Sequence, residues 1–295
     1  IGLIGTQVNG DVESINGNTT VGVNSVVNGG ITYQAPKGIS FSFNKKRRVP
    51  TVIVGPHAQV KGDLRFEREV KLYVHSTAKV GKITGAKRPA ESVMFAAHWD
   101  AYGVGAPDAQ GRTVRPGALD DAIGVAGTVE IARAFKAGPP PERTLVFAAW
   151  TAEERGLLGS EYYGVHPTTP LETMAANLTM DVLQPNGAAR DVVLIGAGQN
   201  GLEDMLATAA AAQGRTVTPD AHPERALFYR ADHFSLARRG VPVLLLMGLG
   251  GGADLVNGGR EAGDRWVSGY TADCYHKTCD AWSADWDLTG AAQDV

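Results

Sequence analysis

The sequence predicts an α/β protein in two parts, a β-rich segment over residues 1–86 and a three-layer α/β/α domain over residues 87–295. From about residue 87 onward, apolar runs of strand length alternate with segments whose apolar residues recur at helical spacing. This alternation favours one sheet with helices on both faces. Before residue 87 the chain carries short β-branched stretches separated by Gly and Asn, a composition that favours β-structure.

The first 86 residues contain two kinds of repeat. An Asn-Gly pair that follows Val or Ile ends at Gly10, Gly17 and Gly29, and Val54–Val60 is echoed by Val74–Val80, offset by 20 residues. Short β-rich units with Gly or Asn at the corners are what a stacked β-solenoid needs. The segment resembles bactofilin-like or hexapeptide-type β-helical repeats, and such repeats would allow self-association. The alternative is an irregular β-rich or mobile extension.

Residues 87–295 carry the expected elements of the sheet domain. Strands are expected over Ser92–Ala97 (ending at His98), Thr144–Trp150, Asn177–Val182, Val192–Gly196 and Val241–Met247. Helices are expected over Gly124–Ala137, Leu202–Gln213 and Asp232–Arg239.

Composition excludes several functions. The net charge of −3 gives no general reason to expect nucleic acid or an acidic membrane surface as a partner. The basic run Lys45–Arg48, beside Pro50, is more typical of a solvated loop than of a phosphate site. No run of about 18 apolar residues predicts a membrane span. Residues 1–10 do not resemble a secretory signal, and the missing initiator Met suggests a mature product or a fragment.

The two cysteines, Cys274 and Cys279, leave two alternatives open. They are too few for a four-thiolate zinc site. Five residues apart around a tight turn, they form either a local disulfide in an oxidising compartment or two free thiols. The disulfide alternative, together with the β-repeats, favours an extracytoplasmic (periplasmic or secreted) location.

Acidic and histidine side chains follow the predicted strands where these strands end. They are His98, Asp100, Asp120, Asp121, Glu153, Glu154, Asp181 and His276. Ligands bind at the carboxyl edge of open α/β sheets, so we expect these side chains to gather there. Histidines with several carboxylates suit Zn²⁺ or a similar divalent metal. The surplus of carboxylates over the needs of one ion favours two metals with a bridging carboxylate.

At this point five dispersed motifs can be compared with a known family. They are His98-Trp-Asp100, Gly117-Ala-Leu-Asp120-Asp121-Ala-Ile-Gly124, Glu153-Glu154-Arg-Gly-Leu-Leu-Gly-Ser160, Asn177-Leu-Thr-Met-Asp181 and Tyr275-His276-Lys-Thr-Cys-Asp280. Their types, order and separations resemble the co-catalytic dizinc aminopeptidases, a group of zinc exopeptidases. The resemblance covers about residues 87–295.

The resemblance implies a role for each of these residues. His98 and Asp181 would bind one zinc ion, Glu154 and His276 the other, and Asp120 would bridge them. Glu153 matches the general base, and Asp100 matches the carboxylate that orients the metal-bound His98. The peptide bond between Asp120 and Asp121 would be cis.

The expected function is a metal-dependent aminopeptidase that removes N-terminal, apolar residues from peptides through a zinc-bridging hydroxide. Glu153 would take a proton from the attacking water and return it to the leaving amine. A carboxypeptidase on the same scaffold is the alternative within this class, since the metal motif does not fix which peptide end binds. A non-catalytic structural or interaction protein is the alternative outside it.

Two features depart from the family pattern. The β-repeat segment stands where the family has helices and strands before the His-x-Asp strand. The chain also stops at Val295, soon after Ala281–Leu288, where a final helix would be expected to cover the sheet. We therefore expect a complete ligand set within a shell that lacks part of its cover.

Overall fold

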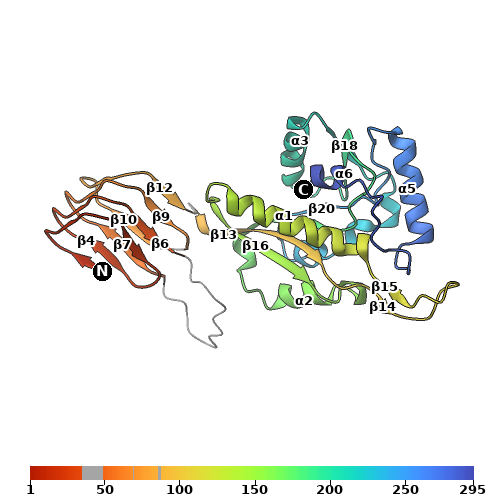
Figure 1. Cartoon of the computed structure of the whole chain (residues 1–295), viewed down its shortest axis with the longest axis horizontal. Coiled ribbons are helices and arrows are strands. Elements are labelled where there is room, and N and C mark those ends of the chain that lie inside the picture. The colour runs from red at the N-terminus through yellow and green to blue at the C-terminus, as the bar shows by residue number, and fades with distance from the viewer. Residues whose placement is uncertain (35–48, 69, 86–87) are drawn as a thin grey trace. The chain divides into compact units, whose positions relative to one another are not determined.

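The computed structural model describes residues 1–34, 49–68, 70–85 and 88–295 (Figure 1). Lys45–Arg48, predicted to be a solvated loop, lies outside the described residues. The chain divides into two compact units, residues 1–90 with 138–144 and residues 91–137 with 145–295. Each unit is described by itself below.

The first unit is built from short parallel strands that pass through three sheets in turn. Their bounds are Gly2–Leu3, Gln7–Val8, Val12–Ser14, Thr19–Val21, Val26–Val27, Ile31–Tyr33, Thr51–Val54, Gln59–Val60, Leu64–Phe66, Lys71–Val74, Lys79–Val80 and Ile83–Gly85, numbered β1–β12 in this order. One sheet has the order β1-β4-β7-β10, the second β11-β8-β5-β2 and the third β12-β9-β6-β3. The unit is β-rich, as the sequence predicted.

The packing of this unit explains why apolar residues and glycine recur in its sequence. Alternate side chains such as Val21, Ile31 and Leu64 are fully buried between the three sheets. At the corners the backbones of successive coils approach closely, and a Cβ on Gly29 would lie 2.6 Å from the carbonyl carbon of Gly10. Gly29 is therefore a position where only glycine fits, and Gly17 has φ of 89°, in the left-handed region that favours glycine. Self-association through this unit remains a prediction.

The second unit contains a six-stranded mixed sheet with the order β16-β13-β17-β20-β18-β19. Its strands are β13 (Arg88–His98), β16 (Arg143–Trp150), β17 (Met174–Met180), β18 (Asp191–Leu194), β19 (Thr216–Pro219) and β20 (Val243–Leu246). β17 runs parallel to both β13 and β20, whereas β18 runs antiparallel to β20. The carboxyl ends of β13 and β17 therefore meet at one edge of the sheet.

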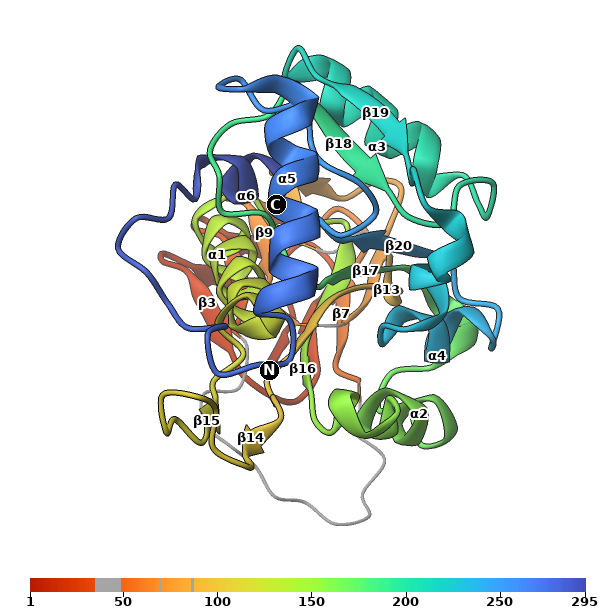
Figure 2. The ribbon, with the colours of Figure 1, turned by 90° about the vertical axis from the view of Figure 1, so that its right-hand side faces the viewer.

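Helices cover both faces of this sheet, which confirms the predicted α/β architecture. They are α1 (Ile123–Ala137), α2 (Leu158–Val165), α3 (Leu202–Ala212), α4 (His233–Ala237), α5 (Gly259–Asp273) and α6 (Thr289–Asp294). Figure 2 shows α1, α5 and α6 on one face and α2, α3 and α4 on the other. Strand β13 contributes side chains to the hydrophobic core on both faces of the sheet. Phe95 packs in the hydrophobic cluster on the α1 side, and Met94 packs in the cluster beside α2 and α4.

Some elements were missing from the sequence prediction. They are the hairpin of β14 (Gly103–Val104) and β15 (Val114–Arg115), strand β19, and helix α5. Helix α5 contains three glycines, which lower helix propensity by about 1 kcal/mol each. One of them, Gly263, is required by packing, since a Cβ there would lie 2.2 Å from the carbonyl oxygen of Ala253. The short helix α6 covers part of the sheet near the expected place of a final helix.

No helix among the residues that the structure describes has the length and apolar character needed to cross a bilayer.

Candidate active site

Three strands carry acidic or histidine side chains to one edge of the sheet. His98 is the last residue of β13, Asp181 directly follows β17, and the 3-10 turn η2 (Glu153–Arg155) follows β16. The backbone N–H of Trp99 donates to the carbonyl of Trp150 at 3.0 Å, so the ends of β13 and β16 lie side by side. The sheet thus gathers these side chains at one edge, as the sequence predicted.

Asp120 reaches the same edge from an irregular turn, η1 (Ala118–Ala122), that precedes α1. The peptide bond between Asp120 and Asp121 is cis, as the family resemblance implied. The carboxylate of Asp280 accepts the backbone N–H groups of Leu119 at 2.9 Å and of Asp120 at 3.2 Å. A distant side chain therefore fixes the backbone that carries the shared ligand.

His276 reaches the site from the loop Cys274–Asp280 after α5, here called the ligand loop. Cys274 and Cys279 are joined by a disulfide, which decides between the two alternatives left open by the sequence. His276 has φ of 62°, in the left-handed region that non-glycine residues seldom occupy. The disulfide closes the loop around a ligand that has an uncommon backbone conformation.

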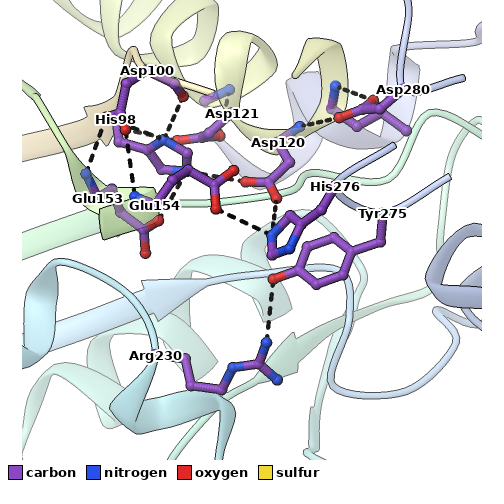
Figure 3. Close-up of polar contacts among 12 residues, drawn as sticks. His98, Asp100, Asp120, Asp121, Glu153, Glu154, Arg230, Tyr275, His276 and Asp280 are labelled. Carbon is purple, nitrogen blue, oxygen red and sulfur yellow. Dashed lines mark hydrogen bonds and ion pairs between the residues drawn. The ribbon is translucent and has the colours of Figure 1, made fainter. Parts of the chain in front are cut away.

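The structure brings the five predicted metal ligands together in two groups that share one residue. Figure 3 shows His98, Asp120, Glu154 and His276 among them. The first metal group is His98, Asp120 and Asp181, and the second metal group is Asp120, Glu154 and His276. In each group, one ligand atom of every residue lies within 4.8 Å of the others. The groups coincide with the two ligand sets that the resemblance implied.

Short contacts through Asp120 connect the two groups. Its two carboxylate oxygens lie 3.0 Å from Nε2 of His98 and 3.0 Å from Nε2 of His276. A carboxylate oxygen of Glu154 lies 3.3 Å from the same nitrogen of His276. A carboxylate that faces two histidines from opposite oxygens has the arrangement that bridging requires.

Glu153 lies beside the groups without belonging to either. Its carboxylate is buried, with one oxygen 3.9 Å from Nε2 of His98. The adjacent Glu154 is a member of the second metal group. The two neighbouring side chains therefore point in different directions from η2. This arrangement would let Glu154 bind a metal ion while Glu153 acts as a base.

Asp100 differs in detail from the expectation. Nδ1 of His98 lies 3.0 Å from the backbone carbonyl of Asp100 and 3.9 Å from its carboxylate. The carboxylate instead accepts the backbone N–H groups of Glu153 at 3.1 Å and Glu154 at 3.4 Å. Asp100 thus faces His98 with its main chain, because its side chain is occupied with the turn that carries both glutamates.

Burial and crowding shift the protonation of the site. Burial, followed by the charge of Asp181, raises the pKa of Glu153 to about 9. Burial and the charge of Asp120 raise the pKa of Glu154 and of Asp181 to about 7 each. Burial lowers the pKa of His98, but its hydrogen bond to Asp120 and the surrounding carboxylates raise it to about 12. In the metal-free chain, these carboxylates therefore carry an excess of negative charge, and the site reduces this charge by binding protons.

This donor set fits divalent metal ions. Each group offers one imidazole nitrogen and at least two carboxylates, the ligands that Zn²⁺ and similar ions accept. Two cations would relieve the repulsion among buried carboxylates that otherwise raises their pKa values.

Three further acidic residues contribute to the site beyond their predicted roles. Asp280 anchors the turn of Asp120, as described above, and also accepts the hydroxyl of Tyr270 at 3.2 Å. Asp121 is buried and accepts the backbone N–H of His98 at 3.1 Å. Asp232 directly precedes α4 and makes no side-chain capping hydrogen bond. It is buried, and its charge adds to the effect of burial in raising the pKa of Glu153 and Asp181. The clue in the sequence was the position of Asp121 and Asp280 within two of the quoted motifs.

A pocket of about 380 Å³ opens beside the two glutamates. Leu157, Tyr229 and Phe234 contribute apolar wall to it, and Arg230 contributes a guanidinium. Arg230 lies 3.5 Å from the hydroxyl of Tyr275, whose ring stacks on that of His276 (Figure 3). Arg238 lines the pocket as well, so the pocket joins the metal groups to apolar side chains and two guanidinium groups.

Comparison with known proteins agrees with this geometry. Residues 79–295 match the profile described as peptidase family M28. A probable zinc metalloprotease of Pyrenophora teres f. teres is 35% identical over 118 residues, which cover 40% of this chain and 24% of that protein. Carboxypeptidase Q of Rattus norvegicus is 40% identical over 89 residues, which cover 30% of this chain and 17% of that protein. The matched stretches span about a quarter or less of these curated relatives.

Two solved structures show more distant likeness. BSAP, a zinc aminopeptidase from Bacillus subtilis, is 16% identical, covering 78% of this chain and 64% of that one, with a TM-score of 0.43. The LapA aminopeptidase of Legionella pneumophila is 21% identical, covering 52% of this chain and 40% of that one, with a TM-score of 0.42.

The match over residues 79–295 shows that this chain belongs to peptidase family M28. It confirms the family resemblance that the five motifs indicated. The resemblance of the first 86 residues to bactofilin-like repeats receives no support from the comparisons and stays a prediction.

Proposed function

We propose that this chain is a dizinc aminopeptidase that removes apolar residues from the N-terminus of peptides. The observation that carries the proposal is the pair of metal groups sharing Asp120, with Glu153 beside them but outside both. One carboxylate that serves two ions and a second that serves none are what a two-metal hydrolytic site needs.

Zinc is the metal that we expect in both groups. Nitrogen and oxygen donors without thiolates suit it, and the relative from Pyrenophora teres f. teres is named a probable zinc metalloprotease. When bound, two zinc ions would lower the pKa of a water molecule and polarise the scissile carbonyl.

The residues of the chain would supply proton transfer and orientation. Glu153 would accept a proton from the attacking water and hand it to the leaving amine, because bound cations beside it would lower the pKa that burial raises in the metal-free chain. Asp100 keeps the backbone of Glu153 and Glu154 in place through two hydrogen bonds. Apolar side chains in the neighbouring pocket, among them Leu157 and Phe234, support a preference for apolar residues.

Metal content and a matched pair of substrates test this proposal. The purified chain should hold two zinc ions and cleave leucine anilide, whereas the same anilide with a blocked amine should stay intact. Glu153→Gln should lower turnover by roughly 10²–10⁴-fold while both ions are retained. A chain that holds no zinc after dialysis against it would contradict the proposal and favour a non-catalytic interaction protein.

A carboxypeptidase is the second candidate, and Arg230 is the observation that favours it. This guanidinium lines the pocket beside the metal groups and could pair with a terminal carboxylate. The relative named carboxypeptidase Q points the same way. Cleavage of an N-blocked dipeptide, with leucine anilide left intact, would decide for this candidate.

An extracytoplasmic location is part of the proposal. The disulfide Cys274–Cys279 supports it, since disulfides persist in oxidising compartments. Thiol titration of the unfolded protein isolated from its natural compartment should find no free thiol; two free thiols would remove this support.

A further inference from the structure

We propose that Asp108, in the β14–β15 hairpin, is a positioning residue that acts on His276 through Thr278 and so sets how tightly the second metal group holds its ion. The inference rests on the proposed function, because it takes the second metal group to bind a metal. It concerns a residue outside both metal groups.

The hairpin presents Asp108 in a fixed orientation. β14 and β15 pair antiparallel, with Gly103 opposite Arg115, and the connecting turn lies between them. Within that turn one carboxylate oxygen of Asp108 accepts the backbone N–H groups of Gln110 and Arg112, both at 2.9 Å. The other oxygen accepts Nε of Arg112 at 2.7 Å. Three N–H groups of the turn thus hold the carboxylate before it contacts any other segment.

The contact with the ligand loop comes from the same carboxylate. Its second oxygen accepts a hydrogen bond from the hydroxyl of Thr278, a residue 170 positions away in the sequence. The Thr278 side chain is buried, and the charged acceptor makes this hydrogen bond stronger than one between neutral groups. The bond ties the end of the hairpin to the ligand loop.

Thr278 lies two residues after His276 within the part of the loop that the Cys274–Cys279 disulfide closes. The N–H of Lys277 donates to the carbonyl of Cys274 at 2.8 Å, which makes this segment a tight turn. In such a turn a displacement of Thr278 is transmitted to the backbone of His276. The disulfide and the turn thus make the loop move as one piece.

The base of the hairpin also contacts His276. Tyr102, the residue before β14, packs its ring against the imidazole with 4.5 Å between centroids, and Tyr275 stacks on the imidazole at 3.7 Å. The guanidinium of Arg155 stands 5.7 Å from the centre of the Tyr102 ring. The hairpin therefore reaches this ligand at two points, from its base through Tyr102 and from its end through Asp108.

His276 needs such support more than His98 does. A metal-bound histidine is usually oriented by a hydrogen bond from its second ring nitrogen. His98 has this bond, from Nδ1 to the carbonyl of Asp100 at 3.0 Å. Within the described residues His276 has no hydrogen-bond partner at Nδ1, so its orientation depends on packing and on the loop. Asp108 is the only charged side chain in the described residues that accepts a bond from Thr278.

The test compares zinc retention in four variants of the whole chain during titration with a competing chelator. Thr278→Val keeps the shape of the side chain and removes the hydroxyl, and Asp108→Ala removes the acceptor. We expect each to weaken the second zinc ion by roughly tenfold and to leave the first unchanged. Thr278→Ser keeps the hydroxyl, and Arg133→Ala removes an exposed ion pair with Glu130 on α1 and leaves the hairpin unchanged. Both should retain zinc as the unaltered chain does.

A spectroscopic readout separates orientation from general destabilisation. With Co²⁺ in place of zinc, the absorption bands of the second ion should change in Thr278→Val and return in Thr278→Ser. Unchanged zinc retention in Thr278→Val and Asp108→Ala would overturn the inference, as would equal weakening of both ions. If the unaltered chain bound no zinc at all, the proposed function itself would fail, which is a different result from either.

Discussion

The two metal groups use similar donors but hold them in different ways. The first is built on the sheet, with His98 at the end of β13 and Asp181 just beyond the end of β17. The second is built on a turn and a loop, with Glu154 in η2 and His276 in the ligand loop. The side chain of His98 is 2% exposed and that of His276 is 26% exposed.

This difference shows that two metal ligands of the same residue type can be held in position by different interactions. His98 is fixed by main-chain bonds, from its N–H to the carboxylate of Asp121 and from Nδ1 to the carbonyl of Asp100. His276 is fixed by ring packing and by a loop that a disulfide and Thr278 restrain. We expect the first metal group to bind its ion more tightly than the second. We also expect substitutions of the residues around the first group to be tolerated less well.

Replacing the shared ligand should have the largest effect. In Asp120→Ala both metal groups lose a member, so we expect both zinc ions to be lost. The fall in turnover should exceed the roughly 10²–10⁴-fold expected for removal of the base. Metal analysis after dialysis and turnover of leucine anilide check this. Retention of one zinc ion would show that the groups do not share Asp120.

Replacing each of the two histidines in turn should have the next largest effect. His98→Ala should remove the first ion and also lower stability by about 1–3 kcal/mol, because it leaves one buried carboxylate oxygen of Asp120 without its partner. His276→Ala should remove only the second ion, with a smaller loss of stability. Zinc stoichiometry and urea unfolding measure both effects. Equal destabilisation by the two changes would break the contrast between sheet and loop.

Gradual chelation should release the two ions in order. The second ion, held from the more exposed loop, should leave at roughly tenfold lower chelator concentration than the first, a difference of about 1.4 kcal/mol. Isothermal titration of the metal-free chain should show the same two steps. A single step for both ions would remove the distinction.

The metal-free chain should lose stability as pH rises. Glu153, with pKa raised from 4.5 to about 9, and His98, raised from 6.5 to about 12, both bind protons more tightly when folded. Their contribution is complete below the unfolded values and is lost as pH rises toward the folded ones. Between pH 6.5 and pH 9 stability should therefore fall by up to about 1.4 kcal/mol per pH unit for each group.

Urea unfolding across this pH range, with and without zinc, is the measurement. Bound zinc supplies the positive charge that the protons otherwise supply, so it should flatten the profile. In the metal-free Glu153→Gln variant the slope should be shallower than in the unaltered metal-free chain. A stability that rises with pH in the metal-free chain would contradict the expected charge balance.

Much of the sheet could be predicted from the sequence because each signal was local, whereas the division into two ligand sets was implied by the family resemblance. Apolar runs that end at an acid or a histidine predicted the strand ends at His98 and Asp181. The Glu153–Glu154 pair follows such a run as well. Where a ligand lies directly beyond a strand, the strand pattern alone indicates its place.

The rest depended on distant packing. Helix α5 was missed because Gly263 lowers helix propensity, although close packing against Ala253 requires it. The bonds from Asp280 to the turn of Asp120 and from Asp108 to Thr278 join residues more than a hundred positions apart. The residues of β18 likewise do not indicate that this strand pairs antiparallel with β20.

The shared position of Asp120 has a consequence for folding as well as for catalysis. The ligands come from segments spread between His98 and His276, so a bound metal cluster ties these segments together as a cross-link would. Any ion that binds only the folded state adds its binding free energy to stability, about 4 kcal/mol at a thousandfold excess over its dissociation constant. The supply of metal during folding would then govern how much of the chain reaches the native state, before any substrate is met.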